Sequence, residues 1–159
     1  MIKVAEKSDD LIDFIFFHEN SIRAAIRDRR LDQGGGTTGG AGTGHSKISD
    51  PTAAQGIRRA SPVTMVTIEY GAAINGIRSS RCIKHPEKWL IVIADTMRFF
   101  EGKKQGEFIR RRYDQYENWQ DTCKAMCCSK SCYYTLKADV LRFAKGMAIG
   151  YGMIPPWQK

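Results

Sequence analysis

Five polar side chains at the start of one predicted helix are of the types that contact DNA. They are Ser129, Lys130, Ser131, Tyr134 and Lys137. Lysine reaches guanine or phosphate, serine bonds to either, and tyrosine offers a hydroxyl group and an apolar ring. The apolar residues of the same segment fall at helical core spacing: Tyr133, Leu136, Val140 and Phe143. Burial of that stripe would leave Lys130, Ser131, Tyr134 and Lys137 facing outward.

The segment before this helix is also predicted to be helical and carries basic residues. Residues 105–116 place four side chains at core spacing: Phe108, Ile109, Tyr113 and Tyr116. The same segment contains three consecutive arginines, Arg110, Arg111 and Arg112. Together with Lys124, these arginines are expected to make salt-sensitive contacts to DNA phosphates.

Two capping residues divide the C-terminal segment into helices joined by short breaks. Asn118 can cap a short helix over residues 119–126, with Trp119, Cys123 and Met126 on one face. Ser129 can cap the helix that follows. In a helix-turn-helix the second helix braces the third, and the start of the third enters the major groove. An ordinary three-helix core with a solvated, mildly basic face is the alternative interpretation.

The charge of the chain supports a polyanionic partner such as double-stranded DNA. Its 159 residues carry a net charge of +8, and the isoelectric point is near 9.4. Binding of basic side chains to phosphates releases counterions, which favours association. Because many basic proteins bind no nucleic acid, charge alone does not establish DNA binding. The length suits one domain or two small ones.

The sequence predicts an intracellular protein that does not enter a membrane. No apolar run approaches the ~20 residues needed to span a bilayer. The first ten residues lack the basic-then-apolar order of a signal peptide.

Four of the five cysteines form the pattern CxxxCCxxxC: Cys123, Cys127, Cys128 and Cys132. An odd total fits reduced thiols in a cytosol better than a disulfide framework. Structural zinc usually takes CxxC pairs or a Cys/His set from two knuckles, so zinc is the minority interpretation. Cys123 and Cys128 instead occupy positions where a helix-turn-helix needs small buried residues. We therefore assign no metal and no cofactor.

No catalytic set of residues competes with the DNA-binding interpretation. The carboxylates are scattered over predicted helix surfaces. No Ser/His/Asp or Cys/His set is anchored to strand ends or glycine turns. The sequence therefore predicts no enzyme.

Residues 1–32 form a predicted N-terminal region dominated by one long amphipathic helix. We expect this helix over residues 8–31, with Ser8 as its cap. Its apolar stripe comprises Leu11, Phe14, Ile15, His18, Ile22, Ala25 and Ile26. His18 lies within the stripe and is expected to be a packed core residue, not a ligand. The stripe is expected to pack on the rest of the chain or on a second copy.

Residues 33–49 are predicted to be a flexible, glycine-rich linker, since glycine at this density cannot offset its ordering entropy. The linker contains a near-match to a phosphate-binding loop. His45 replaces the required lysine, and a charged helix precedes the loop where a buried strand is needed, so we reject nucleotide binding.

Residues 50–102 form a predicted middle region that is mostly helical. Asp50 and Pro51 are typical of a helix start, and Arg58 and Arg59 lie in that short helix. Residues 63–70 read as a strand and 71–75 as a turn, and residues 77–83 either return as a second strand or belong to a partly helical linker. A further helix opens at Pro86 and ends near residue 102. Its apolar face comprises Trp89, Val92, Ile93, Thr96 and Phe100.

The fold class predicted from these elements is mainly α. Residues 103–159 would form a C-terminal helix-turn-helix domain, and the middle region would contribute at most one small β-hairpin.

The order of these motifs resembles the phage and prophage transcriptional regulators of the RinA/ArpU type. The resemblance covers most of the chain and rests on SDPTAAQGIRRAS, KHPEKWL, IRRRYDQYENWQDTCKAMCCSKSCYYTLKADVL and GMAIGYGMI. The segment SKSCYYTLKADVL is also similar to region 4 of bacterial sigma factors. Two positions depart from that pattern. Cys127 stands where the turn often has glycine, which predicts strain, and Thr135 stands where a basic residue is common.

The resemblance implies activation of late phage genes by binding near a promoter, in the cytoplasm of a bacterial host. The long first helix or the KHPEKWL helix would then contact a second copy or RNA polymerase. Two alternatives remain open. One is a phage small terminase subunit that binds the packaging site, and the other is a helical interaction module that binds no DNA.

Overall fold

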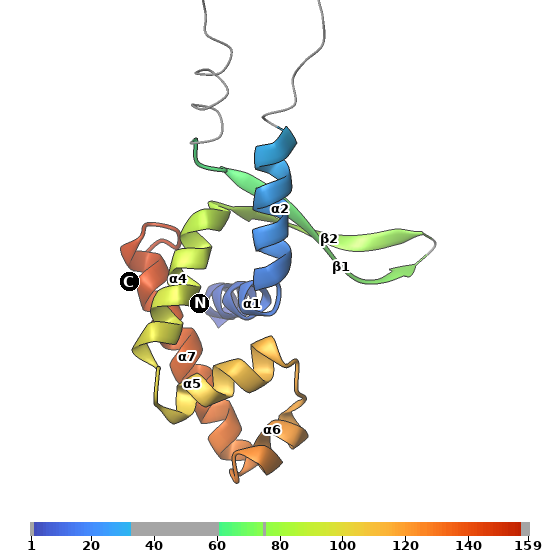
Figure 1. Cartoon of the computed structure of the whole chain (residues 1–159). Helices are drawn as coiled ribbons and strands as arrows, with labels where there is room; N and C mark the ends of the chain where they lie inside the picture. The colour runs from blue at the N-terminus through green and yellow to red at the C-terminus, as the bar shows by residue number, and fades with distance from the viewer. Residues whose placement is uncertain (1, 33–60, 75, 157–159) are drawn as a thin grey trace, which may run out of the picture. The chain divides into compact units, whose positions relative to one another are not determined.

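The protein is described by a computed structural model that covers residues 2–32, 61–74 and 76–156 (Figure 1). The glycine-rich segment 33–49, the helix expected at Asp50 and Pro51, and Arg58 and Arg59 lie outside these residues. The described residues contain six α-helices, one short π-helix and one two-stranded antiparallel sheet. The prediction of a mainly α protein with one small β-hairpin is therefore confirmed.

The chain divides into two compact units, the first of which combines two separate stretches of sequence. Unit 1 comprises Met1–Glu19 and Lys88–Lys159, and unit 2 comprises Asn20–Glu87. The N-terminal helix α1, Ile2–Phe17, thus belongs to the same unit as the C-terminal helices.

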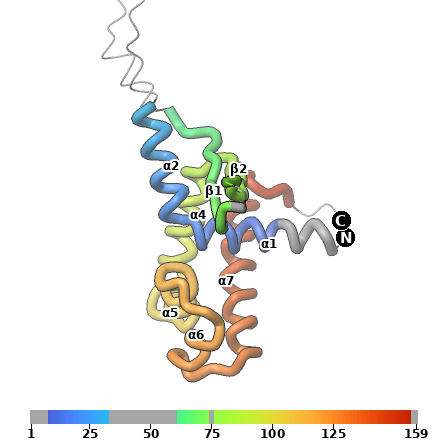
Figure 2. The backbone as a smooth tube through the Cα atoms, turned by 90° about the vertical axis from the view of Figure 1, so that its right-hand side faces the viewer, coloured from blue at the N-terminus to red at the C-terminus, as the bar shows by residue number. Residues whose placement is uncertain are grey.

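Unit 1 is assembled around the long helix α7, Lys130–Gly150. Helices α1, α5 (Lys104–Ile109) and α6 (Trp119–Ala125) all contact α7. A π-helical turn, Arg110–Asp114, continues α5 and contacts α1 and α6. Figure 2 shows α5 and α6 beside the first half of α7. The largest side chains that are completely buried in this unit are Tyr133, Phe108, Ile12, Ile15, Ile93 and Ile109.

Helix α4, Pro86–Phe99, begins where the sequence predicts. All five residues of its expected apolar face are at most 6% exposed: Trp89, Val92, Ile93, Thr96 and Phe100. The Thr96 hydroxyl donates to the carbonyl oxygen of Val92 at 2.7 Å, which satisfies this polar group inside the core.

The prediction of one helix over residues 8–31 is wrong, because the helix is interrupted at His18. Helix α1 ends at Phe17, and α2 runs over Glu19–Asp32. Ser8 lies inside α1 and does not cap it. The interruption adjoins the boundary between the two units, and the buried apolar residues before and after it belong to different units. In α1 the buried set is Ile12, Ile15 and Phe16, whereas α2 buries Ile22 and Ile26.

His18 itself is only half-buried, but its ring packs on an aromatic neighbour. The His18 and Phe14 ring centroids are 4.2 Å apart. Burial lowers the pKa of His18, as expected for an imidazole packed against apolar atoms.

Unit 2 contains a β-hairpin whose turn lies later than expected. Strand β1, Met65–Ile74, pairs antiparallel with β2, Ile77–Lys84. The register shifts between Tyr70 and Ile74, where Gly71 has a φ of +77°. The chain reverses next to Gly76, whose φ is +79°, and not over residues 71–75. Glycine adopts such angles without a side-chain penalty. Gly71 therefore accommodates the irregularity within β1, and Gly76 accommodates the reversal of the chain.

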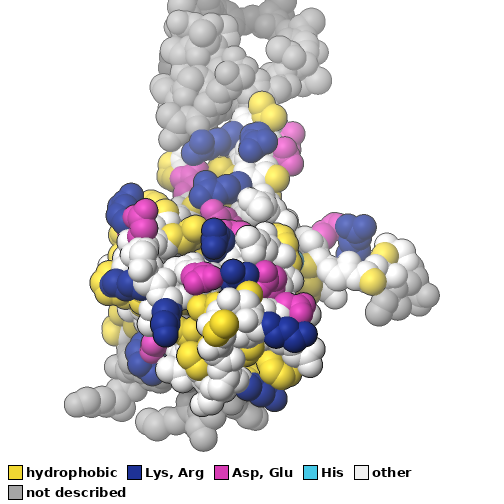
Figure 3. Space-filling model, turned by 60° about the horizontal axis from the view of Figure 1, so that its bottom comes forward, with side chains coloured by type: hydrophobic (Ala, Val, Ile, Leu, Met, Phe, Trp, Pro, Cys, Tyr) yellow, Lys and Arg dark blue, Asp and Glu magenta, His cyan; other side chains and the backbone are white. Residues whose placement is uncertain are grey.

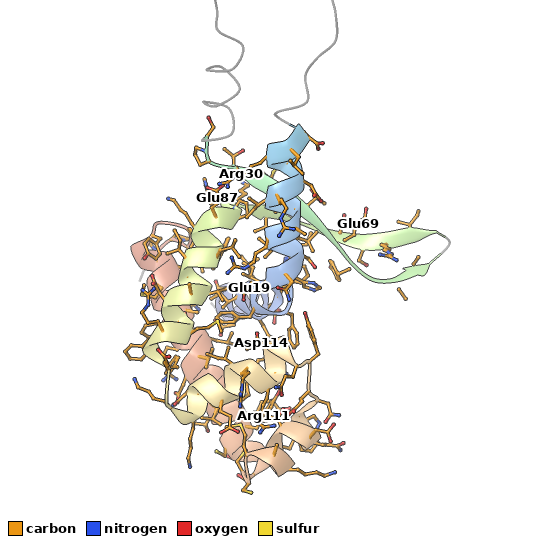
Figure 4. The ribbon with its side chains drawn as sticks, viewed as in Figure 1. Glu19, Arg30, Glu69, Glu87, Arg111 and Asp114 are labelled. Atoms are coloured by element: carbon orange, nitrogen blue, oxygen red, sulfur yellow. The ribbon has the colours of Figure 1, made fainter. Side chains whose placement is uncertain are left out.

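Near the other end of the hairpin, one carboxylate joins separate segments of unit 2. The Glu87 carboxylate accepts hydrogen bonds from Arg30 at 2.8 Å and from the backbone N–H of Val63 at 3.2 Å (Figure 4). This contact links the end of α2 with the residues before β1.

Replacement of Gly106 in α5 by alanine is expected to destabilise the protein, although alanine has the better helix propensity. A Cβ atom at this position would lie 2.3 Å from the backbone oxygen of Phe100. We expect Gly106→Ala to lower the free energy of unfolding by about 1–3 kcal/mol, because the backbone must shift. Urea denaturation followed by circular dichroism measures this change.

Gly146→Ala is the matched control, because a Cβ atom at position 146 in α7 meets nothing within 4 Å. This variant should gain about 0.5–1 kcal/mol from helix propensity. Equal stabilisation by both substitutions would contradict the close approach of Gly106 to Phe100.

Candidate nucleic-acid interface

Both helices of the α6–α7 pair begin with the capping residues expected from the sequence. The Asn118 side chain accepts hydrogen bonds from the backbone N–H groups of Gln120 and Asp121, at 2.9 and 3.0 Å. The Ser129 hydroxyl oxygen accepts from the N–H of Cys132 at 3.2 Å. Each cap satisfies N–H groups that the helix leaves without a partner. These contacts fix where α6 and α7 start.

The connection between the two helices, residues 126–129, is a Schellman turn. The N–H of Cys128 donates to the carbonyl oxygen of Cys123 at 3.0 Å, and that of Cys127 donates to Lys124 at 3.2 Å. Cys127 takes the left-handed position of this motif with a φ of +49°. Because glycine usually occupies that position, the expected strain at Cys127 is present.

The first turn and a half of α7 present polar side chains to solvent. Ser129, Lys130 and Ser131 are exposed, and the Tyr134 side chain is 51% exposed. Below them, Tyr133, Leu136 and Val140 are buried as expected, whereas Phe143 is half-buried and stacks on Phe99. The Ser129 hydroxyl serves the cap as an acceptor, so its proton remains able to donate.

Trp119 belongs to this exposed surface, which the sequence analysis missed. It was expected on the packed face of α6 with Cys123 and Met126. Instead Trp119 is 37% exposed, and the ammonium group of Lys130 lies 4.9 Å from its ring centroid. Trp119 directly follows the Asn118 cap, so it is the first residue of α6. This position could have indicated that its side chain is exposed, because the first turn of a helix has no preceding turn to cover it. The ring and the ammonium group form a cation–π contact.

Two of the expected DNA-contacting residues, Lys137 and Arg112, are engaged inside unit 1. The Lys137 ammonium group lies 2.9 Å from the Asp13 carboxylate. The Arg112 guanidinium lies 3.1 Å from the same carboxylate and also donates to the Tyr133 hydroxyl. The Arg112 and Lys137 side chains are only 15% and 25% exposed. The prediction that Lys137 faces outward is therefore wrong, because α1 supplies a carboxylate that holds this cation. The same carboxylate engages Arg112, which was expected to contact DNA phosphates.

Asp13 is ionised despite its partial burial. Burial by itself would raise the pKa of this carboxyl group. The hydrogen bonds from Tyr113, at 2.6 Å, and Lys137, together with the charges of Arg112 and Lys137, outweigh burial and hold the pKa below its ordinary value of 3.8. The ring of Tyr113 also packs against Phe16 and Phe17 of α1.

The remaining expected phosphate contacts do not form one cluster. Arg111 bridges Glu107 at 3.0 Å and Glu117 at 3.2 Å and is 21% exposed (Figure 4), so its charge is already compensated. Lys124 is exposed near the end of α6. Arg110 is exposed as well, but it lines an open pocket of about 800 Å³ whose described lining comes from α4, α5 and the segment between and after them. Only Lys124 adjoins the connection to α7.

Tyr116 also differs from the prediction. It was expected in the core of the first helix, yet it is 58% exposed and has a φ of +56°. The π-helical turn ends at Asp114, so Tyr116 lies in the break before Asn118 and loses the helical spacing on which the prediction depended.

Positive charge is dispersed on the end of unit 1 that carries α6 and the start of α7. Figure 3 views this end and shows lysine and arginine side chains as separate groups among acidic and apolar ones. The surface therefore differs from a continuous basic stripe.

No metal-binding arrangement is present in the described part of the chain, where no three His, Cys, Asp or Glu side chains are grouped to hold an ion. Within the same residues, no helix is long and apolar enough to cross a bilayer. No family model, curated protein or solved structure matches this chain.

Removal of the Asp13 charge is expected to destabilise unit 1 in a pH-dependent way. Asp13→Asn leaves Lys137 and Arg112 without their counter-charge, which should lower the free energy of unfolding by about 2–4 kcal/mol at neutral pH. Folding lowers the pKa of Asp13. The stability that its carboxylate contributes is therefore fully present above pH 3.8, the ordinary pKa, and is lost as the pH falls through the lowered pKa of the folded state.

Chemical denaturation over a pH series measures the difference between the two proteins. Asp10→Asn, at an exposed position of α1, is the matched control and should cost less than about 0.5 kcal/mol. A stability difference for Asp13→Asn that stays constant from neutral to acidic pH would contradict the assigned ion pairs.

Proposed function

We propose that the protein is a sequence-specific, double-stranded-DNA-binding regulator of transcription, with the start of α7 in the major groove. The observation that carries this proposal is the exposed row Ser129, Lys130, Ser131 and Tyr134 on a helix whose start is fixed by a capped, tightly hydrogen-bonded turn. Rigid placement matters because base readout requires side chains held in register with the base edges.

The chemistry of this row suits mixed contacts to bases and phosphates. Lys130 supplies a positive charge, the two serines supply short donors and acceptors, and Tyr134 supplies a hydroxyl and an apolar edge. The cation–π contact with Trp119 restrains the position of the Lys130 ammonium group. Lys124, on the preceding helix, is the proposed contact to the phosphate backbone.

We further propose, from the resemblance to regulators of the RinA/ArpU type, that the protein activates late phage genes inside a bacterial host. In this scheme α4 contacts RNA polymerase or a second copy. Three apolar side chains of α4 are exposed and support a contact role: Ile91, Met97 and Phe99. Protein mass in solution separates this proposal from a packaging subunit, because a ring of many copies would favour packaging.

The proposal predicts that single substitutions at the start of α7 weaken specific DNA binding. Affinity is measured for fragments of the genome that encodes the protein, over a series of salt concentrations. One fragment should be retained preferentially. Lys130→Ala and Tyr134→Ala should each cost about 1–3 kcal/mol on that fragment while leaving helicity unchanged.

Arg142→Ala is the matched control, because Arg142 is an exposed cation on the same helix, more than three turns further along. It should change affinity for specific and non-specific fragments alike, and only slightly. Unaltered specific affinity in both Lys130→Ala and Tyr134→Ala would remove the recognition-helix assignment. Equal, weak retention of every fragment would remove sequence-specific regulation altogether.

A further inference from the structure

The β1–β2 hairpin of unit 2 is packed mainly in the half opposite its turn. Its buried side chains all lie in that half: Val66, Ile68 and Ile83. In the other half, residues 71–73 and 76–80 are all exposed, and the Ile77 side chain next to the turn is 75% exposed. Figure 1 shows this end of the hairpin extending away from α2. The core of unit 2 therefore explains one half of the hairpin and gives the other half no packing role.

One face of the hairpin is exposed along its whole length. Residues that pair across two strands share a face, and successive residues along a strand point to opposite faces. The face opposite the buried side chains therefore includes six exposed residues of the two strands: Thr67, Glu69, Arg78, Ser80, Cys82 and Lys84. We call this surface the outer face.

The outer face carries a cation near each end. Arg78 and Lys84 are six positions apart in β2, which corresponds to ~20 Å of extended chain. The hydroxyl groups of Thr67 and Ser80 lie between them. Within the described residues, neither cation forms an ion pair. Glu69 (Figure 4) is the one acidic residue from Met65 to Lys84, against three basic residues, so the hairpin has a positive net charge.

The positive charge of the chain is concentrated in unit 2. Asn20–Glu87 contain ten lysine and arginine residues and five aspartate and glutamate residues, so this unit contributes +5 of the total of +8. The surface around the start of α7 in unit 1, by contrast, has dispersed charge. Because neutralised phosphates set the salt-dependent part of DNA affinity, unit 2 is the better source of that part.

Two features of the hairpin oppose strand pairing with a second copy. Its second strand carries three cations, and charged side chains on an edge strand discourage the addition of a further strand. Its first strand is irregular between Tyr70 and Ile74, which interrupts the regular row of backbone groups that a partner strand needs. A polyanion therefore fits the hairpin better than another copy of the chain.

We propose that the outer face of the β1–β2 hairpin is a second DNA-contacting surface, in which Arg78 and Lys84 bind backbone phosphates without reading the sequence. This inference rests on the proposed DNA-binding function and adds to it a contact from unit 2. The two surfaces belong to one chain, so binding of the first gives the second a high effective concentration on the same duplex. A contact that is weak by itself then raises the affinity for specific and unrelated DNA alike.

The test compares the full-length wild-type protein with the double variant Arg78→Ala/Lys84→Ala. Affinity is measured on the preferred fragment and on an unrelated duplex of equal length, over a series of salt concentrations. The slope of log affinity against log salt counts the neutralised phosphates. Arg27→Ala/Arg29→Ala is the matched control, because it removes the same charge from exposed positions of α2. Circular dichroism and the thermal midpoint verify that each variant is folded.

The hairpin variant should lose about 1.8 from the magnitude of the slope on both duplexes, at ~0.9 for each lost phosphate contact. The ratio of specific to non-specific affinity should stay the same, whereas Lys130→Ala lowers that ratio. The control should keep a slope close to that of the wild-type protein.

An unchanged slope in the hairpin variant, with the wild-type preference for its fragment intact, would overturn the hairpin contact and leave the proposed function standing. An equal loss of slope in the control would show an effect of net charge alone and would also overturn the contact. Absence of DNA binding by the wild-type protein would remove both proposals. A hairpin variant with normal DNA binding but a lower mass in analytical ultracentrifugation would assign the hairpin to a second copy instead.

Discussion

The arrangement of unit 1 depends on one carboxylate that compensates two cations from distant parts of the chain. Asp13 of α1 meets Arg112 of the π-helical turn and Lys137 of α7, and it also accepts a hydrogen bond from the Tyr113 hydroxyl. Partly buried cations are costly without a counter-charge. Asp13 therefore holds α1 against both later elements, and the apolar contacts of Phe16 and Phe17 with Tyr113 surround this polar centre.

This constraint also decides which residues α7 can offer to a partner. Since Lys137 is held by Asp13, the exposed polar side chains at the start of the helix are those of Ser129, Lys130, Ser131, Tyr134 and Thr135. The caps at Asn118 and Ser129 and the hydrogen bonds of the Schellman turn fix that surface relative to α6. A surface with few charges and two exposed aromatic rings favours contacts that depend on geometry more than on net charge.

Local features were predictable from sequence, and contacts across long separations were not. Asn118 and Ser129 cap their helices as expected, because a cap depends only on the next three residues. The apolar face of α4 was predicted for a similar reason, since helical spacing alone determines it. Lys137 and Asp13, by contrast, are separated by 124 positions, so no local pattern indicated their contact. The interruption at His18 was missed because the apolar spacing continues through it, although the boundary between the two units follows directly after Glu19.

The most direct test of the central claim, that the start of α7 contacts DNA, is site-specific photo-crosslinking to the preferred DNA fragment. A photoreactive residue is placed at Ser131 in one protein and at Arg142 in another, both exposed positions of the same helix. Contact of the start of α7 with DNA should give efficient, salt-sensitive crosslinking from position 131 and little from position 142. Crosslinking from position 142 alone, or equally from both positions, would contradict the proposed interface.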